Sequence, residues 1–176
     1  MKTLIAQTRD ASKLGLYYVA LQSSLTIPDI AGALIAGDRR ASSSRYAHWF
    51  DTWVRSVLSS NRNRENPFSG EQCYRFRCSM LHQGASHRED LPYKRIMFVE
   101  PGHPNGQLHY VVLGSASAEP ALLIQIDEFI EEMLVGCERW LNEVAGTQPF
   151  ENNYALFARR HPTGLKPWLS GVPVIG

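Results

Sequence analysis

The segment from Pro120 to Val144 constrains the fold more than any other part of the sequence. Its apolar side chains recur every three or four residues, which places them along one face of an α-helix. Its acidic side chains gather near the beginning, where the dipole of a helix favours negative charge. The apolar positions are Leu123, Ile126, Ile130, Met133, Leu134, Cys137, Trp140 and Leu141. The sequence therefore predicts a long amphipathic helix at the centre of a helical core.

Four earlier segments also carry the spacing of apolar residues that is typical of helices. They are residues 4–24, 26–37, 45–58 and 69–84. Thr26 is the expected N-cap of the second segment. The fourth begins with a capping-box pattern, Ser69 and Gln72, and ends at Gly84, which suits a C-terminal cap. With the long helix, these segments predict about five helices.

The pattern changes after residue 94, where two runs rich in β-branched and aromatic residues follow each other. They cover residues 95–99 and 107–113, and the Asn105–Gly106 pair between them favours a tight turn. The sequence therefore predicts a β-hairpin at residues 95–113, inserted between the fourth helix and the long one. Since two strands do not make an independent domain, we expect the hairpin to pack on the helices.

The expected fold is mainly α, with one domain and a tail. A chain of 176 residues fits a single hydrophobic core, and we place the helical domain with its hairpin insertion at residues 1–146. Residues 147–176 contain four prolines and a basic triplet at residues 159–161. This composition predicts an irregular tail that packs on the domain or on a partner.

Charge and cysteine usage bear on the partners and the compartment of the protein. Lys and Arg number 18 against 17 Asp and Glu, so no overall positive field attracts nucleic acid and any polyanion site must be local. Three cysteines without a C-x-x-C spacing are typical of reduced thiols. No apolar run reaches the roughly 20 residues that cross a bilayer, and the N-terminus does not resemble an export signal. We therefore expect a cytoplasmic protein with no membrane partner.

No metal and no other cofactor is expected. His103 and His109 flank the predicted hairpin, and together with His87 they are the histidines most suggestive of a metal site. They lack the short-spaced Cys, Asp or Glu partners that metal sites normally show. The phosphate loop G-x-x-x-x-G-K-[ST] and the nucleophile elbow G-x-S-x-G are also missing. ATP-dependent and esterase activities therefore lack support.

The predicted helix at residues 69–84 holds the side chains best suited to chemistry. At about 100° per residue, Arg75, Ser79 and His82 share one face of this helix, and Arg77 falls on a more apolar side. An arginine in such a place must pair with an acid or reach a cleft, because an unpaired buried guanidinium is too costly.

These residues resemble the R-x4-6-H signature of the HEPN superfamily, whose members are helical domains that often dimerise and often cleave RNA. Arg77 and His82 match the R-x4-H spacing, whereas Arg75 and His82 match the looser R-x6-H spacing, so both arginines are candidates. The resemblance implies a HEPN-like helical bundle, and the order of helices over residues 4–144 is similar to that of the family. One departure is Cys78, since many nuclease members carry a polar residue, frequently Asn, directly after the arginine.

The resemblance further implies a metal-independent endoribonuclease, possessed by a toxin or a phage-defence system, that uses Arg77 and His82 as catalytic residues. Histidine titrates near neutral pH and suits the proton transfer, and a guanidinium offsets charge on the phosphate. The implied partners are RNA, a second copy in a homodimer, and an antitoxin or other protein. The expected substrate contacts are Arg75, Ser79, Gln83 and Arg88.

Two alternatives stay open from the sequence. His82 could cap the end of its helix while Arg77 pairs with an acid of the long helix, in which case the segment is structural. A HEPN-like domain without turnover would instead be a binding or interaction module that senses a nucleotide or a protein partner.

Overall fold

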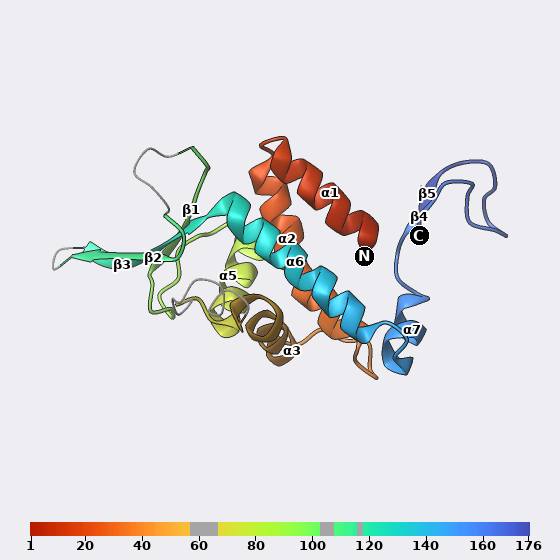
Figure 1. Ribbon diagram of the computed structural model, residues 1–176, viewed down its shortest axis with the longest axis horizontal. Coiled ribbons are helices and arrows are strands. Elements are labelled where there is room, and N and C mark those ends of the chain that lie inside the picture. The colour runs from red at the N-terminus through yellow and green to blue at the C-terminus, as the bar shows by residue number, and fades with distance from the viewer. Residues whose placement is uncertain (57–66, 103–107, 116–117) are drawn as a thin grey trace.

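A computed structural model describes residues 1–56, 67–102, 108–115 and 118–176 (Figure 1). Most of the described residues with regular structure are helical, which confirms the prediction of a mainly α protein. The helices are α1 (Lys2–Lys13), α2 (Tyr17–Leu34), α3 (Ser43–Phe50), its π-helical continuation η1 (Asp51–Arg55), α5 (Gly70–Gln83), α6 (Ile126–Val144) and α7 (Gln148–Tyr154). The strands are β1 (Arg95–Val99), β2 (Val111–Ser115), β3 (Ala118–Gln125), β4 (Arg160–His161) and β5 (Val174–Ile175).

The long helix α6 lies at the centre of the core, as the spacing of its apolar residues predicts. It runs across the other helices and contacts α1, α2 and η1, with the three-stranded sheet at one end of the molecule and the β4–β5 ribbon at the other (Figure 1). Its inward-facing side chains, among them Phe129, Ile130, Met133 and Leu134, are fully buried. The aromatic rings of Phe50, Phe68 and Phe98 pack around Phe129.

The first two helices do not divide where the sequence predicts. The break lies at Gly15, whose backbone has φ +75°, and α2 then continues through both Thr26 and Pro28. Thr26 is therefore not an N-cap, and its hydroxyl donates a hydrogen bond to the carbonyl of Ser23 within the helix. Leu25 and other apolar residues on both sides of Pro28 are buried, and this burial holds the helix together across the proline, which alone would favour a break.

The predicted hairpin at residues 95–113 is wrong, because its two strands do not pair with each other. The sheet has the order β1-β3-β2, in which β3 pairs parallel with β1 and antiparallel with β2. The sequence pattern placed part of β3 in the long helix, since a short apolar run such as Ala121–Ile124 is compatible with either structure. Leu122 and Ile124 of this central strand are fully buried. The Asn105–Gly106 pair lies outside the described residues.

The C-terminal segment is more regular than its proline content predicts. In α7, the ring of Phe150 packs edge-on against Trp140 of α6 at 5.7 Å between centroids. The side-chain amide of Asn153 donates to the carbonyl oxygens of Leu34 and Ala36, each at 2.9 Å, and so caps the end of α2. Beyond Phe157 the chain forms the small β4–β5 ribbon. Among the described residues, no helix has the length and apolar character needed to cross a membrane.

Candidate functional site

The helix that carries the candidate motif is fixed at both ends. Ser69 and Gln72 form the predicted capping box, and Gly84 ends the helix in the left-handed conformation at φ +65°. At the N-terminus, the amide of Gly70 donates to Oδ1 of Asp51 at 2.9 Å. A Cβ on Gly70 would lie 2.2 Å from the carbonyl oxygen of Ala47, so only glycine lets α5 approach α3 this closely.

Arg77 and His82 lie together on α5, and an acid from another helix joins them. Nη1 of Arg77 is 2.9 Å from Nε2 of His82, and Nη2 of Arg77 is 2.6 Å from Oδ2 of Asp29 on α2. The Arg77 and Asp29 side chains are only 18% and 15% exposed, whereas His82 lies at the surface. The site is thus a partly buried ion pair with an exposed imidazole at its edge.

The contact between Arg77 and His82 defines the state of the ring. A guanidinium can only donate hydrogen bonds, so Nε2 of His82 accepts and the ring is neutral, with its proton on Nδ1. Nε of Arg77 is buried and has no hydrogen-bond partner among the described residues. The guanidinium therefore keeps one donor that an oxygen of a bound ligand could use after a small movement.

Burial and the neighbouring positive charge shift the pKa of Asp29 in opposite directions. Burial raises the pKa of its carboxyl above the usual value, although the nearby Arg77 acts in the opposite direction. Its Oδ2 has an ion-pair contact with Arg77 but no well-directed hydrogen bond among the described residues. Burial thus favours the protonated form of Asp29, while the ion pair with Arg77 favours the charged form.

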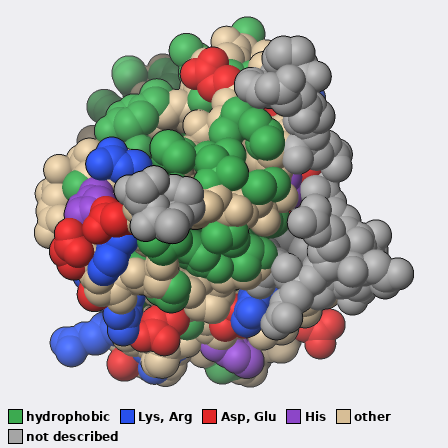
Figure 2. All heavy atoms as spheres, turned by 90° about the vertical axis from the view of Figure 1, so that its left-hand side faces the viewer, with side chains coloured by type: hydrophobic (Ala, Val, Ile, Leu, Met, Phe, Trp, Pro, Cys, Tyr) green, Lys and Arg blue, Asp and Glu red, His purple; other side chains and the backbone are tan. Residues whose placement is uncertain are grey.

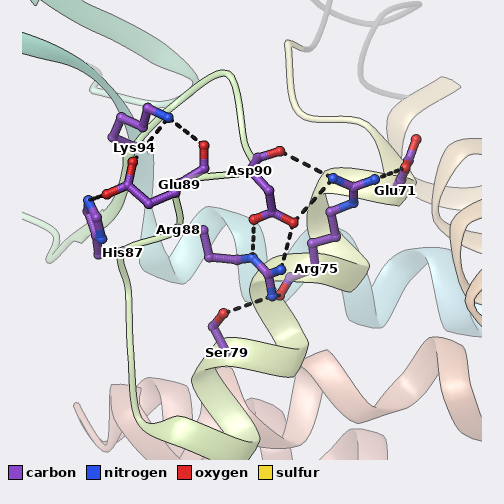
Figure 3. Close-up of polar contacts among 8 residues, drawn as sticks. All are labelled: Glu71, Arg75, Ser79, His87, Arg88, Glu89, Asp90 and Lys94. Carbon is purple, nitrogen blue, oxygen red and sulfur yellow. Dashed lines mark hydrogen bonds and ion pairs between the residues drawn. The ribbon is translucent and has the colours of Figure 1, made fainter.

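Three of the four expected substrate contacts, Arg75, Ser79 and Arg88, lie in a separate charge network (Figure 3). Arg75 forms ion pairs with Glu71 at 2.5 Å and with Asp90 at 3.3 Å. Arg88 binds both carboxylate oxygens of Asp90, at 2.6 and 2.7 Å, and donates to Oγ of Ser79 at 3.1 Å. In this geometry the network fastens residues 85–94 to α5.

The two candidate arginines of the motif differ in what they contact. Both Arg75 and Arg77 have a spacing to His82 that fits the motif, but only Arg77 contacts the imidazole. Gln83, the last residue of α5, is exposed next to His82. Arg77, His82 and Gln83 thus share one end of the helix, while Arg75 is occupied by acids elsewhere.

The buried face of α5 includes Ser79, one of the expected substrate contacts. Cys73, Phe76 and Ser79 are buried, whereas Cys78 and Leu81 are partly exposed. The reason is that β1 and the segment after α5 cover the Phe76 side, where the Phe76 and Phe98 rings lie 5.5 Å apart. Ser79 is therefore inside the protein and not on a face that a substrate would reach.

Two of the three thiols are unsuited to nucleophilic chemistry. Burial raises the pKa of both Cys73 and Cys137 to about 12, so neither forms a thiolate near neutral pH. Cys73 Sγ lies 3.4 Å from the hydroxyl of the buried Tyr46. These two cysteines are structural, as their apolar surroundings indicate.

A second polar cluster joins the sheet to α6. The ring of His109 is almost fully buried, and its Nε2 lies 3.0 Å from Oε1 of Glu132. The other carboxylate oxygen of Glu132 accepts from the hydroxyl of Tyr110 at 3.0 Å. Glu128 lies one helical turn before Glu132, and one ligand atom from each of His109, Glu128 and Glu132 falls within 4.8 Å of the others. The sequence does not predict this grouping, because the histidine and the glutamates are far apart in the chain.

The hydrogen bonds of His109 do not suit a metal ligand. Its Nδ1 accepts from the backbone amide of Gln125 at 3.1 Å, so the single proton of the neutral ring is on Nε2. Binding a metal through Nε2 would move that proton to Nδ1, where it would face the Gln125 amide hydrogen. The cluster is therefore better suited to a hydrogen-bonded His–Glu–Tyr link than to a cation. His103 lies outside the described residues.

Comparisons of the chain with family models, with curated proteins and with solved structures found no match.

Asp29 is the site residue that the sequence reasoning missed. It lies in a stretch of α2 in which several residues, including Leu25, Ile27 and Ala31, are fully buried. A single acid in such a stretch predicts a cationic partner from another element, since an unpaired buried carboxylate is too costly. That signal was available in the sequence, but the identity of Arg77 as the partner was not.

Proposed function

We propose that this chain is a metal-independent endoribonuclease of HEPN type, in which Arg77 and His82 act on a phosphodiester. The observation that carries the proposal is the 2.9 Å contact between Nη1 of Arg77 and Nε2 of His82 at the exposed end of α5. It brings together a group that can bind a phosphate and a neutral imidazole that can accept a proton. The resemblance of the R-x4-H spacing supplies the substrate class.

In the proposed reaction, an incoming phosphate exchanges partners with the resting site. The phosphate oxygens take the Arg77 guanidinium, including its unused Nε donor, away from Asp29 and His82. Nε2 of His82 is then free to accept the proton of the 2′-hydroxyl. The 2′-oxygen forms a bond to the adjacent phosphorus, the bond to the 5′-oxygen breaks, and that oxygen takes a proton from water. The products are a 2′,3′-cyclic phosphate and a 5′-hydroxyl.

The raised pKa of Asp29 supports this exchange. The burial that raises this pKa offsets part of the attraction between the carboxylate and Arg77. Asp29 thus holds Arg77 in place in the resting protein and yields it to the substrate. Toxin or phage defence is the biological role that we propose for such an activity, with an antitoxin or another protein as its restraint.

The proposal includes a homodimer. Hydrophobic side chains gather on the face at the sheet end of the molecule (Figure 2). A mostly apolar cleft of about 380 Å³ lies between α2, α5 and β1, and its lining includes Tyr18, Met80 and Met97. Tyr18 and Met97 are 59% and 37% exposed. Pairing of two copies through this face is the homodimer that we propose, and light scattering tests it directly.

Incubation of the purified protein with mixed RNA in EDTA tests the activity. The proposal expects fragments that end in a 2′,3′-cyclic phosphate and their loss in the His82→Ala protein. Intact RNA across varied substrates contradicts it. That result would favour the second candidate, a binding module without turnover, for which the neutralisation of Arg77 by Asp29 is the supporting observation.

A further inference from the structure

The last part of the chain is an arm without a core of its own. None of the residues 158–176 is buried, and the arm leaves the helices at the end of the molecule opposite the sheet (Figure 1). Its ribbon consists of two strands of two residues each. An isolated two-stranded ribbon is only marginally stable in water. The arm therefore offers surface to a partner and contributes little to the packing of the helices.

The arm also differs from the rest of the chain in charge. All 17 acidic residues lie at or before Glu151, whereas three of the 18 basic residues follow it. These are Arg159, Arg160 and Lys166, and none of them forms an ion pair with any described residue. The arm is a local cationic region on a chain of almost balanced charge, and its partner is therefore anionic.

Trp168, two residues after Lys166, supplies a flat apolar surface in the arm. Its side chain is 79% exposed, whereas Trp49 and Trp140 are at most 2% exposed. Trp53 is half-buried. An exposed indole next to cations is suited to stack on a base while the cations contact phosphates.

A cleft of about 680 Å³ lies at the base of the arm and adds two further arginines to the cationic region. Its apolar floor includes Ile30 and Phe157, and Arg39 and Arg40 lie at its edge. The one acid in its lining, Asp38, is already paired with an arginine outside the cleft, Arg45, at 3.0 Å. Ile30 directly follows Asp29 in α2, so the cleft adjoins the helix turn that holds Arg77.

We propose that the arm and the cleft at its base bind single-stranded nucleic acid, with Trp168 stacking on a base and the arginines and Lys166 contacting phosphates. Only the identification of the ligand as RNA rests on the proposed function. A duplex fits less well, because its bases are stacked inside and offer no face to the indole. The cleft would lead the strand from the arm toward α2, which carries Asp29.

The test is binding of a labelled single-stranded RNA of about 12 nucleotides to the full chain carrying His82→Ala, which prevents cleavage during the measurement. In this background we expect Trp168→Ala to raise Kd about 5- to 100-fold and Trp168→Phe to retain most of the affinity. Arg160→Gln should reduce the magnitude of the negative slope of log K against log salt by about 0.7, the contribution of one phosphate contact on a single strand. RNA should also quench the fluorescence of Trp168, and the Trp168→Ala protein should lose this signal.

Matched controls come from the end of α1, away from the arm. Leu14→Ala removes another exposed apolar side chain and Lys13→Gln another exposed cation, and both should leave Kd unchanged. Since Trp168 and Arg160 are exposed, their variants should melt like the parent. Equal affinity of the Trp168→Ala protein and its parent, absence of binding at low salt, or equally tight binding of duplex RNA would each overturn the proposal.

The outcomes separate this proposal from the enzymatic one. Binding that depends on Trp168, together with intact RNA after incubation with the unmodified chain, supports the arm and contradicts the ribonuclease. Cleavage that requires His82, together with binding that is indifferent to Trp168 and Arg160, supports the ribonuclease and overturns the role of the arm.

Discussion

Arg77 of α5 and Asp29 of α2 form an ion pair whose closest atoms are 2.6 Å apart, with both side chains mostly shielded from water. The same guanidinium contacts His82, so the motif arginine has a structural partner on one side and a candidate catalytic partner on the other. Stability and chemistry therefore depend on the same side chain. Variants must be chosen so that the two contributions can be measured separately.

The ion pair predicts coupling between Arg77 and Asp29 in the free energy of unfolding. Arg77→Ala leaves a shielded carboxylate without its partner, and we expect a loss on the order of 3 kcal/mol in urea unfolding. Adding Asp29→Asn removes the unpaired charge and should recover part of that loss, with a coupling energy of about 0.5–3 kcal/mol. The exposed Arg139→Ala is the control. Additive losses would contradict a direct interaction.

The pKa of Asp29 gives this prediction a pH dependence. A carboxyl with a raised pKa holds its proton more tightly in the folded than in the unfolded protein. Its contribution to stability is thus present at low pH and declines as the pH rises from the usual value of 3.8. Without Arg77 the pKa should rise further, so the loss caused by Arg77→Ala should be smaller near pH 4 than at pH 7.

The close approach of α5 to α3 predicts that Gly70 tolerates no side chain. In Gly70→Ala, the new Cβ would lie 2.2 Å from the Ala47 carbonyl oxygen. The oxygen is part of the backbone of α3 and the Cβ is bonded directly to the backbone of α5, so neither atom can move away without shifting a helix. We expect a loss of about 1–3 kcal/mol or more from overpacking. Gly37→Ala is a matched control, because a Cβ there meets nothing within 4 Å. Equal unfolding midpoints for the two variants would contradict the observed packing.

The sequence predicts the helices better than the sheet, and the reason is physical. The spacing of apolar residues and the capping signals at Ser69 and Gly84 are local, and the structure confirms both caps. The pairing of β1 with β3 is not local, since Arg95 lies opposite Ala121. The nearer run at residues 107–113 offered a simpler partner, so the sequence favoured a hairpin that the structure does not contain.

The candidate site was predictable only in part for a similar reason. The spacing of Arg77 and His82 along one helix places them near each other without any knowledge of the rest of the fold. The third member, Asp29, comes from α2, and its position depends on how two helices pack. The burial of Ser79 depends likewise on the segment after α5, which carries Arg88. Helical geometry alone cannot supply either contact.

The network on the other side of α5 predicts a titration. Hydrogen bonds from Arg88 hold the pKa of Asp90 at about 2, below the usual value of 3.8. A lowered pKa means that the contribution of Asp90 to stability is present above pH 3.8 and declines as the pH falls toward 2. Arg88→Gln should therefore raise the pKa of Asp90 in an NMR titration and increase hydrogen exchange in residues 85–94. An unchanged pKa would show that Arg88 does not set it.

The hydrogen bonds of His109 predict the response to metal. Because Nδ1 accepts from Gln125, excess Zn²⁺ should leave the melting temperature of EDTA-treated protein unchanged. His109→Ala leaves the mostly buried Glu132 with fewer partners and should cost about 1–3 kcal/mol. A rise in melting temperature with Zn²⁺ that disappears in Glu128→Gln would contradict this account and reveal a metal site.

His82 provides the sharpest separation of chemistry from stability. If it accepts the 2′-hydroxyl proton, His82→Ala should lower the rate of RNA cleavage by about 10²- to 10⁴-fold. The melting temperature should change little, because the ring is exposed and its hydrogen bond is with Arg77 of the same helix. Gln83→Ala alters an exposed neighbour and should reduce the rate far less.

The arginine of the motif is identified by the same assay. Arg77→Lys keeps a charge beside Asp29 but loses the planar donors that bind a phosphate. The rate of RNA cleavage should therefore fall strongly, while the free energy of unfolding should change little. Arg75→Ala should loosen residues 85–94, to which Arg75 is tied through Asp90, and leave the rate per folded molecule nearly unchanged. Should the His82→Ala and Arg77→Lys proteins cleave as fast per folded molecule as the parent, the Arg77–His82 contact is structural and the catalytic assignment is wrong.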